Sequence, residues 1–260
     1  MSVDFKSLFL SASILWDSGE AMDEEVGRRL ADMLGALARF DYCVIFAYCG
    51  EARPIDLYST FDEREYHVFV TLYQEGPYLL DPFYRAATLP RPGVWRMREL
   101  APDRFFASEY YRTYYVETRL AEEIGFFIPV DGGATVVLSL MRAQGTGLFR
   151  AGDIDLLRKA EPLVAAMIRR RWGDLGRRFA QAEPVPPSAP TPGSRPTLTQ
   201  REKAIIQLVL QGHSSESIGL TLGIATGTVK VHRRNIYRKL GIASQTQLMS
   251  HYLESLRVNG

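Results

Sequence analysis

The sequence predicts a two-domain protein, in which an α+β domain with an antiparallel sheet and helices on its faces precedes a small all-α domain. Three observations carry this prediction. Apolar residues alternate between helical and strand spacing through residues 1–178. A proline-rich stretch without apolar periodicity follows, and only helical patterns occur after it. We therefore expect a sensor-type domain at 1–178, a linker at 179–196 and a helical domain at 197–260.

The composition excludes disordered and fibrous classes. Of the 260 residues, 46% are apolar and 23% are charged, which is typical of globular domains. The N-terminus lacks a basic segment followed by a continuous apolar core, and no stretch approaches the roughly 20 apolar residues that span a bilayer. We expect a cytoplasmic protein with no membrane partner.

The first domain is predicted to mix helices with short strands. Cys43 and Cys49 lie an even number of residues apart in a β-prone run, so we expect both on one sheet face, with no disulfide framework and no metal site. Asp131, Gly132 and Gly133 form a hairpin-type turn. The expected elements are a helix at 23–39, strands at 42–48 and 55–59, a helix at 62–74, strands at 94–97, 125–130 and 135–141, and a helix at 153–172 that Pro162 opens or bends. This order resembles sensor domains of the GAF or PAS type.

The last domain begins with a capping box. Thr199 and Glu202 have the spacing that satisfies two helix-start amides, so a helix starts near Gln200 and is ended by Gly212. Ser214 caps a short second helix that Gly223 ends. Thr226 is the expected cap of a third helix, which runs to about residue 240, and a fourth covers 245–256. The pattern is helix, turn, helix.

The third helix divides into an apolar face and a cationic face. Val229, Ile236 and Leu240 belong to the core, whereas cationic and hydroxyl side chains recur on the other side. Residues 197–260 hold eight Lys and Arg against three Asp and Glu, a net charge of +5 in a chain of +1. A helix with long donors on one face fits the DNA major groove, so we expect double-stranded DNA as partner.

LTQREKAIIQLVLQGHSSESIGLTLGIATGTVKVHRRNIYRKLGIASQTQL, from residue 198, resembles the LuxR-type helix-turn-helix without gaps. The resemblance implies a bacterial transcription regulator that binds an operator as a homodimer and contacts RNA polymerase if it activates. By matching positions it implies that Lys230, Val231 and Arg234 face bases. The implied phosphate contacts are Thr226, Thr228, Arg233, Arg238 and Lys239.

Three positions depart from that family's pattern. Ala225 replaces the usual serine cap, so Thr226 must take over that role or the helix start is weaker by about 1 kcal/mol. Gln245 stands where arginine is common, and Gly219 where alanine is common. The last helix carries an apolar stripe that serves either the dimer or packing within the domain, namely Leu248, Met249, Tyr252 and Leu256.

The first domain carries no acidic pair of a phosphorylated receiver and no phosphate-binding loop. It resembles the autoinducer-binding domain of quorum-sensing regulators through Asp81-Pro82, Trp95 and the paired strands of residues 125–140. The resemblance implies that Asp81 accepts from a ligand amide and that Trp95 closes a pocket. The family's preceding aromatic pair is matched by Phe69 and Tyr73 only after a shift of one residue. Both an acyl-homoserine lactone and a non-lactone small molecule remain open as ligands.

An aromatic cluster offers further ligand contacts, because phenol groups can orient a partly polar ligand. Core packing is the alternative for each member. The cluster comprises Phe105, Phe106, Tyr110, Tyr111, Tyr114 and Tyr115, and we take Tyr110 and Tyr111, together with Ser139 outside it, as candidates.

The sequence therefore predicts a DNA-binding regulator controlled by a small molecule. The alternative is a ligand-independent regulator whose first domain is a dimerisation or protein-interaction module. His67 is the only histidine before the linker, and no catalytic motif accompanies it, so we expect neither an enzyme nor a cofactor.

Overall fold

A computed structural model describes residues 22–89, 91–116, 118–181 and 198–259. The chain forms two compact units. The first consists of Met1–Gln74, Phe83–Leu100 and Arg119–Val185, and the second of Glu75–Pro82, Ala101–Thr118 and Pro186–Gly260. Two short segments of the first half of the sequence thus pack with the C-terminal helices. The sequence-derived domain boundaries stay a prediction, and most of the expected linker lies outside the described residues.

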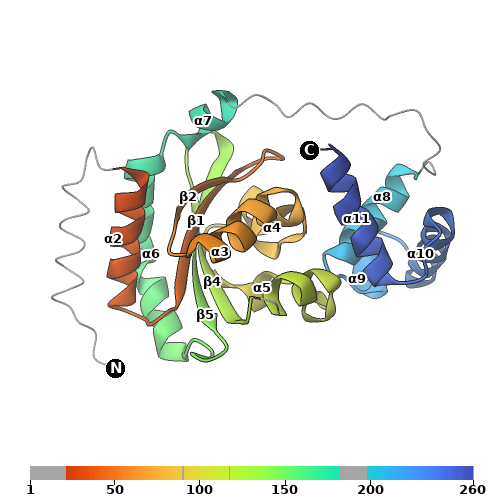
Figure 1. Ribbon diagram of the computed structural model, residues 1–260, viewed down its shortest axis with the longest axis horizontal. Coiled ribbons are helices and arrows are strands. Elements are labelled where there is room, and N and C mark those ends of the chain that lie inside the picture. The colour runs from red at the N-terminus through yellow and green to blue at the C-terminus, as the bar shows by residue number, and fades with distance from the viewer. Residues whose placement is uncertain (1–21, 90, 117, 182–197, 260) are drawn as a thin grey trace. The chain divides into compact units, whose positions relative to one another are not determined.

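The first unit is built on a five-stranded antiparallel sheet, as predicted (Figure 1). Its strand order is β2-β1-β5-β4-β3, and every neighbouring pair is antiparallel. The predicted strands are all present, and the hairpin strands are longer than expected. The strands are β1 (Tyr42–Cys49), β2 (Ile55–Ser59), β3 (Gly93–Arg96), β4 (Leu120–Pro129) and β5 (Ala134–Ala143).

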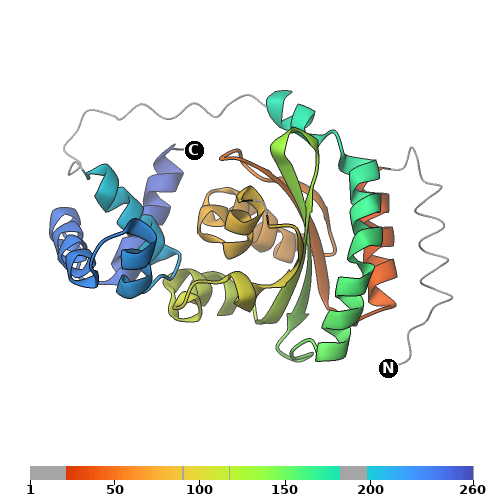
Figure 2. The same cartoon turned by 180° about the vertical axis from the view of Figure 1, so that it is seen from behind.

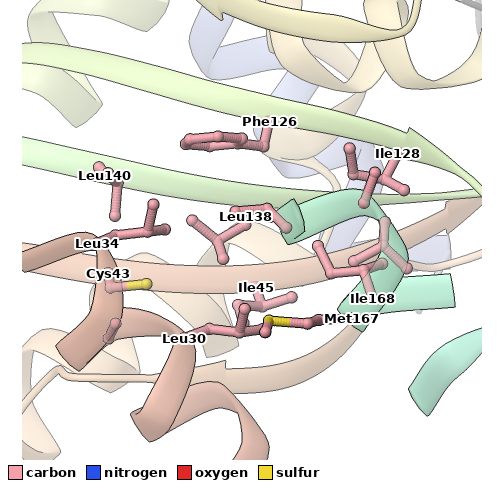
Figure 3. Packing of buried hydrophobic residues seen from close by; sticks show 14 of the residues in the cluster. Leu30, Leu34, Cys43, Ile45, Phe126, Ile128, Leu138, Leu140, Met167 and Ile168 are labelled. Atoms are coloured by element: carbon pink, nitrogen blue, oxygen red, sulfur yellow. The ribbon is translucent and has the colours of Figure 1, made fainter. Parts of the chain in front are cut away.

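Two helices cover one face of this sheet. Helices α2 (Asp23–Gly35) and α6 (Ala151–Trp172) lie side by side on that face in both views (Figures 1 and 2). Figure 3 shows Leu30 and Leu34 of α2 and Met167 of α6 against strand side chains such as Ile45. We call this the helix-covered face, and it holds the hydrophobic core.

The strand period of two explains which side chains enter this core. In β1, Cys43 and Ile45 lie in the helix-covered core, whereas Phe46 and Tyr48 lie on the opposite face, which we call the sensor face. Cys49 packs against the same core as Cys43, which confirms that the two cysteines share a face.

The β4–β5 hairpin turns through Asp131–Gly133, where Gly132 has a φ of 73°. A Cβ at Gly132 would lie 2.6 Å from the Cα of Gly176, at the start of α7 (Leu175–Gln181). This helix follows α6 directly. The hairpin tip and α7 therefore pack backbone against backbone, and only glycine fits at this contact.

Helix α6 differs from the prediction in two ways. It begins at Ala151, and the Asp153 carboxylate accepts from the Arg150 amide at 3.0 Å. It also continues past Pro162, which lies on the exposed side, where water can reach the carbonyl that has lost its amide donor.

The remaining segments of the first half are short helices. The predicted helix at 62–74 is α3 (Glu63–Tyr66), which is continued by a π-helical stretch, His67–Leu72. A 3-10 turn (Pro77–Leu80), α4 (Pro82–Thr88) and α5 (Met97–Leu100) precede a further 3-10 turn (Phe105–Ala107) and a π-helical stretch (Tyr111–Val116).

Four helices make up the C-terminal part of the second unit, which confirms the predicted all-α region. They are α8 (Gln200–Leu210), α9 (Ser215–Leu222), α10 (Thr226–Leu240) and α11 (Gln245–Asn259), labelled in Figure 1. Within the described part of the chain, no helix is both long enough and apolar enough to cross a membrane.

The two cysteines should differ in reactivity. Cys43 is fully buried, and burial raises the pKa of its thiol, whereas Cys49 is half-buried. We expect iodoacetamide to modify Cys49 at least about tenfold faster than Cys43 in the native protein, and both at similar rates after unfolding. Mass spectrometry of the labelled peptides measures this ratio. Rapid native labelling of Cys43 in the Cys49→Ala variant would contradict the packing.

Candidate nucleic-acid interface and sensor face

The start of α8 is fixed by the predicted capping box. The Glu202 amide donates to the Thr199 hydroxyl at 3.2 Å, and the Thr199 amide donates to the Glu202 carboxylate at 2.8 Å. Lys239 near the end of α10 also donates to that carboxylate at 2.8 Å. These hydrogen bonds, that from Lys239 above all, lower the pKa of Glu202 to about 2. One carboxylate therefore joins the first helix to the third.

The second helix is capped at both ends as predicted. The Ser214 hydroxyl accepts from the Ser217 amide at 3.1 Å, and Gly223 ends α9 in the left-handed conformation with a φ of 64°. Gly219 stands where the LuxR-type pattern favours alanine. A Cβ there would lie 2.7 Å from the Ile224 carbonyl oxygen, so the tight turn after α9 explains this departure.

The predicted cap of α10 is wrong. The N-cap residue is Ala225, which has extended backbone angles and no side-chain capping bond, and Thr226 is already the first helical residue. Because Thr226 has entered the helix, its hydroxyl no longer occupies the position that reaches back to the free amides. The start of α10 thus lacks a side-chain cap.

Helix α10 presents a buried and an exposed side. Val229 and Ile236 are 0% and 1% exposed and fix the orientation of the helix. Lys230 and Arg234 are exposed one turn apart, and Val231 exposes 46% of its surface between them. An exposed valine between two cations suits a surface that contacts both thymine methyl groups and guanine edges.

Some of the expected phosphate donors have partners within the chain. Arg233 donates to the Ser215 hydroxyl at 3.3 Å, and Arg238 to the Asn235 side chain at 3.2 Å. Lys239 pairs with Glu202, as described above, whereas Thr228 is exposed. Phosphate contact by these side chains and by Thr226 stays a prediction, and Lys239 has a clear structural role.

The apolar stripe of α11 packs within the unit at two positions. Leu248 and Met249 are 2% and 3% exposed. Tyr252 is half-buried, and the side chain of Leu256 lies outside the described residues. Gln245, which replaces a common arginine, donates to the Val209 carbonyl at 3.2 Å and so ties α11 to α8.

The sensor face of the sheet holds one of the predicted ligand contacts at its centre. Ser139 on β5 pairs with Val44 on β1 and with Gly125 on β4, and it is 4% exposed. Gly125 leaves room for Phe83, whose ring would be 2.8 Å from a Cβ at that position.

A pair of phenols lies on the same face. The hydroxyl groups of Tyr48 and Tyr73 are 3.0 Å apart, and the Tyr73 ring packs against Phe46 at 5.3 Å between centroids. Tyr73 was predicted as a ligand contact, whereas Phe46 and Tyr48 were not. Their spacing of two in a β-prone run, with apolar residues between, was the sequence signal that both lie on one sheet face.

Trp95 and Phe69 both contact other parts of the chain. The Trp95 indole N–H donates to the backbone carbonyls of Arg91, at 3.1 Å, and Pro92, at 3.3 Å. Phe69 stacks on Phe61 with centroids 4.6 Å apart. The indole donor is therefore already used, and a ligand contact by either residue stays a prediction.

The other three predicted ligand residues belong to the second unit. Asp81 is buried, Tyr110 is buried beside Phe105 with centroids 6.0 Å apart, and Tyr111 is half-buried. Phe105 is itself fully buried, so for it the core-packing alternative holds. The side chain of Tyr114 lies outside the described residues. Within the described parts of the chain, no group of acidic, histidine and cysteine side chains forms a metal site.

Capped helices, a glycine corner and an exposed basic side on α10 define a DNA-binding regulator of the helix-turn-helix class. Comparison with known proteins identifies the family. The pattern of the luxR family of bacterial regulatory proteins matches residues 196–252. An HTH-type transcriptional regulator of the exeN 3′ region in Aeromonas salmonicida is 33% identical over 188 residues, which cover 68% of this chain and 94% of that protein. The chain belongs to the LuxR family and is a transcriptional regulator.

One solved structure shares the fold of the first domain, and a second is similar at a lower score. The VqsR LBD domain from Pseudomonas aeruginosa is 27% identical, with a TM-score of 0.53, over 64% of this chain and 94% of that chain. Escherichia coli SdiA is 19% identical, with a TM-score of 0.45, over 94% of each chain.

The pairing of Glu202 with Lys239 should make the stability of the second unit depend on pH. Because the folded pKa of about 2 lies below the usual 4.5, the pairing stabilises the fold above about pH 5 and is lost as the pH falls toward 2. We expect Glu202→Gln to lower the melting temperature most near neutral pH, with the difference shrinking toward pH 2. Thermal melts across this range measure it, with the exposed Glu216→Gln as control. A pH-independent difference would contradict the pairing.

Proposed function

We propose that this regulator binds operator DNA as a homodimer and that a small molecule held by its first domain controls this binding. We place it in the cytoplasm, without catalytic activity or a cofactor, and with RNA polymerase as a partner if it activates transcription. The exposed cationic side of α10 carries the DNA part of the proposal. The sensor face, which holds the buried Ser139 and the Tyr48–Tyr73 phenol pair, supports the ligand part.

Lys230, Val231 and Arg234 are the proposed base-reading residues. Buried Val229 and Ile236 hold the helix so that these three side chains project from the opposite side. In helix-turn-helix proteins this helix enters the major groove, where a bidentate contact discriminates bases by about 1–3 kcal/mol.

We expect Lys230→Ala and Arg234→Ala each to weaken binding to the selected operator by about 1–3 kcal/mol and to relax base preference. Operator sequences are first selected from a random pool with the full chain, and affinity is then measured by fluorescence anisotropy. Lys203→Ala is the matched control, because it removes the same charge from an exposed position on α8. Unchanged affinity and base preference in both variants would refute the assigned reading side.

The ligand part places the polar end of a small molecule at Ser139 and beside the Tyr48–Tyr73 pair. Because the Trp95 indole N–H already donates to two backbone carbonyls, Trp95 offers a ligand its ring and not its donor. In this proposal the Trp95 ring closes the pocket, and both a lactone and a non-lactone molecule are candidate ligands.

We expect native mass spectrometry of protein purified from its own host to detect a fraction with a bound small molecule. Ser139→Ala and Tyr73→Phe should each reduce that fraction, since each removes one hydroxyl without adding volume, whereas Trp95→Phe should preserve it. Melting temperatures confirm that the variants are folded. Protein without any adduct, in all variants, would favour the alternative of a dimerisation or protein-interaction module.

A further inference from the structure

The turn between α8 and α9 is covered by a segment from the first half of the sequence. This segment, Ala101–Thr118, belongs to the same compact unit as the helix-turn-helix. The Arg104 amide donates to the Gly212 carbonyl at 2.9 Å, and the Asp103 carboxylate accepts from the Ser214 amide at 3.0 Å. We call residues 103–105 the clamp.

The turn is shaped for this close approach. Gly212 is buried and has a φ of 91°, and a Cβ there would lie 2.6 Å from the Cα of Phe105. Phe105 is fully buried. A third hydrogen bond, from the Gln211 side chain to the Leu79 carbonyl at 3.2 Å, adds a second segment to the cover. The clamp and the α8–α9 turn are therefore joined by close backbone packing and by hydrogen bonds.

The clamp brings a negative charge to the positive end of α9. Asp103 accepts from the amide of Ser214, the N-cap residue of this eight-residue helix. Partial burial opposes ionisation, but the hydrogen bonds to Ser214 and the nearby His213 together hold the pKa of Asp103 below its usual value. Arg233 of α10 reaches the same end through Ser215. The Asp103 carboxylate is thus ionised and lies at the positive end of α9.

In a DNA complex, the N-terminus of α9 would face a phosphate of the DNA backbone. In helix-turn-helix proteins the helix before the recognition helix crosses the DNA backbone, and backbone amides at helix N-termini contact phosphates. A phosphate and the Asp103 carboxylate cannot both lie at Ser214 without strong repulsion.

We propose that the clamp occupies a phosphate-binding surface of the α8–α9 turn, with Asp103 in the place of a DNA phosphate, and that it detaches when duplex DNA binds. The free protein then holds its DNA-binding surface partly closed, and any event that loosens the clamp raises DNA affinity. This inference rests on DNA binding by α10, and the experiment separates the two.

The first test compares two variants that remove one negative charge from the same segment. Asp103→Asn weakens the clamp, whereas Glu109→Gln alters a carboxylate that pairs with Arg112. The probe is a mixed-sequence duplex of about 30 base pairs at low salt, where backbone contacts dominate binding. We expect Asp103→Asn in the full chain to bind about three- to tenfold more tightly than both wild type and Glu109→Gln.

The second test follows the clamp directly by hydrogen exchange of peptides that contain Arg104, whose amide donates to Gly212. We expect this amide to be protected in the free protein and to exchange faster when the duplex is added. Equal affinity of the two variants, or unchanged protection in the DNA complex, overturns the clamp. A wild-type chain that does not bind the duplex at all contradicts the proposed function instead.

Discussion

Burial of one face of the sheet by α2 and α6 is the constraint on which the first domain depends. These two helices take every second side chain of the central strands into a continuous core, in which Leu30, Ile45 and Leu138 are fully buried. A strand that commits one face in this way necessarily presents its other residues on the opposite face. The position of Ser139, Tyr48 and Phe46 on the sensor face is therefore a consequence of core packing.

Packing also determines which side chains the DNA-binding helices expose. The four C-terminal helices enclose little core of their own, so polar contacts at helix ends supplement it. Glu202 links the start of α8 to the end of α10, Arg201 donates to the Leu222 carbonyl at 2.7 Å, and Gln245 holds α11 on α8. Because the Glu202–Lys239 pair and the buried Val229 and Ile236 orient α10, the base-reading residues can remain exposed without losing their position.

Much of this architecture was predictable because it depends on local sequence. Strand alternation, the glycine turn between β4 and β5, the Thr199–Glu202 capping box and the left-handed Gly223 all follow from neighbouring residues. The family resemblance further predicted the helix-turn-helix, which the comparisons confirmed.

The features that the sequence did not predict depend on tertiary contacts or on the backbone angles of single residues. The identity of the α10 N-cap depends on which of two adjacent residues adopts extended angles, and Ala225 does so in place of Thr226. The contacts of Tyr73 with Phe46 and Tyr48 join segments that are distant in the sequence, which no spacing reveals. Contact between residues 103–105 and Gly212 joins segments more than a hundred positions apart, and only a folded chain brings them together.

The meeting of Gly132 with Gly176 has a mechanical consequence. Helix α7 is the last described element before the segment that connects the two halves of the protein, and it is held to the hairpin tip with no side chain between the two backbones. No side chain lies between the two backbones that could change its rotamer to absorb a movement. A displacement of the β4–β5 tip therefore moves the start of α7 with it.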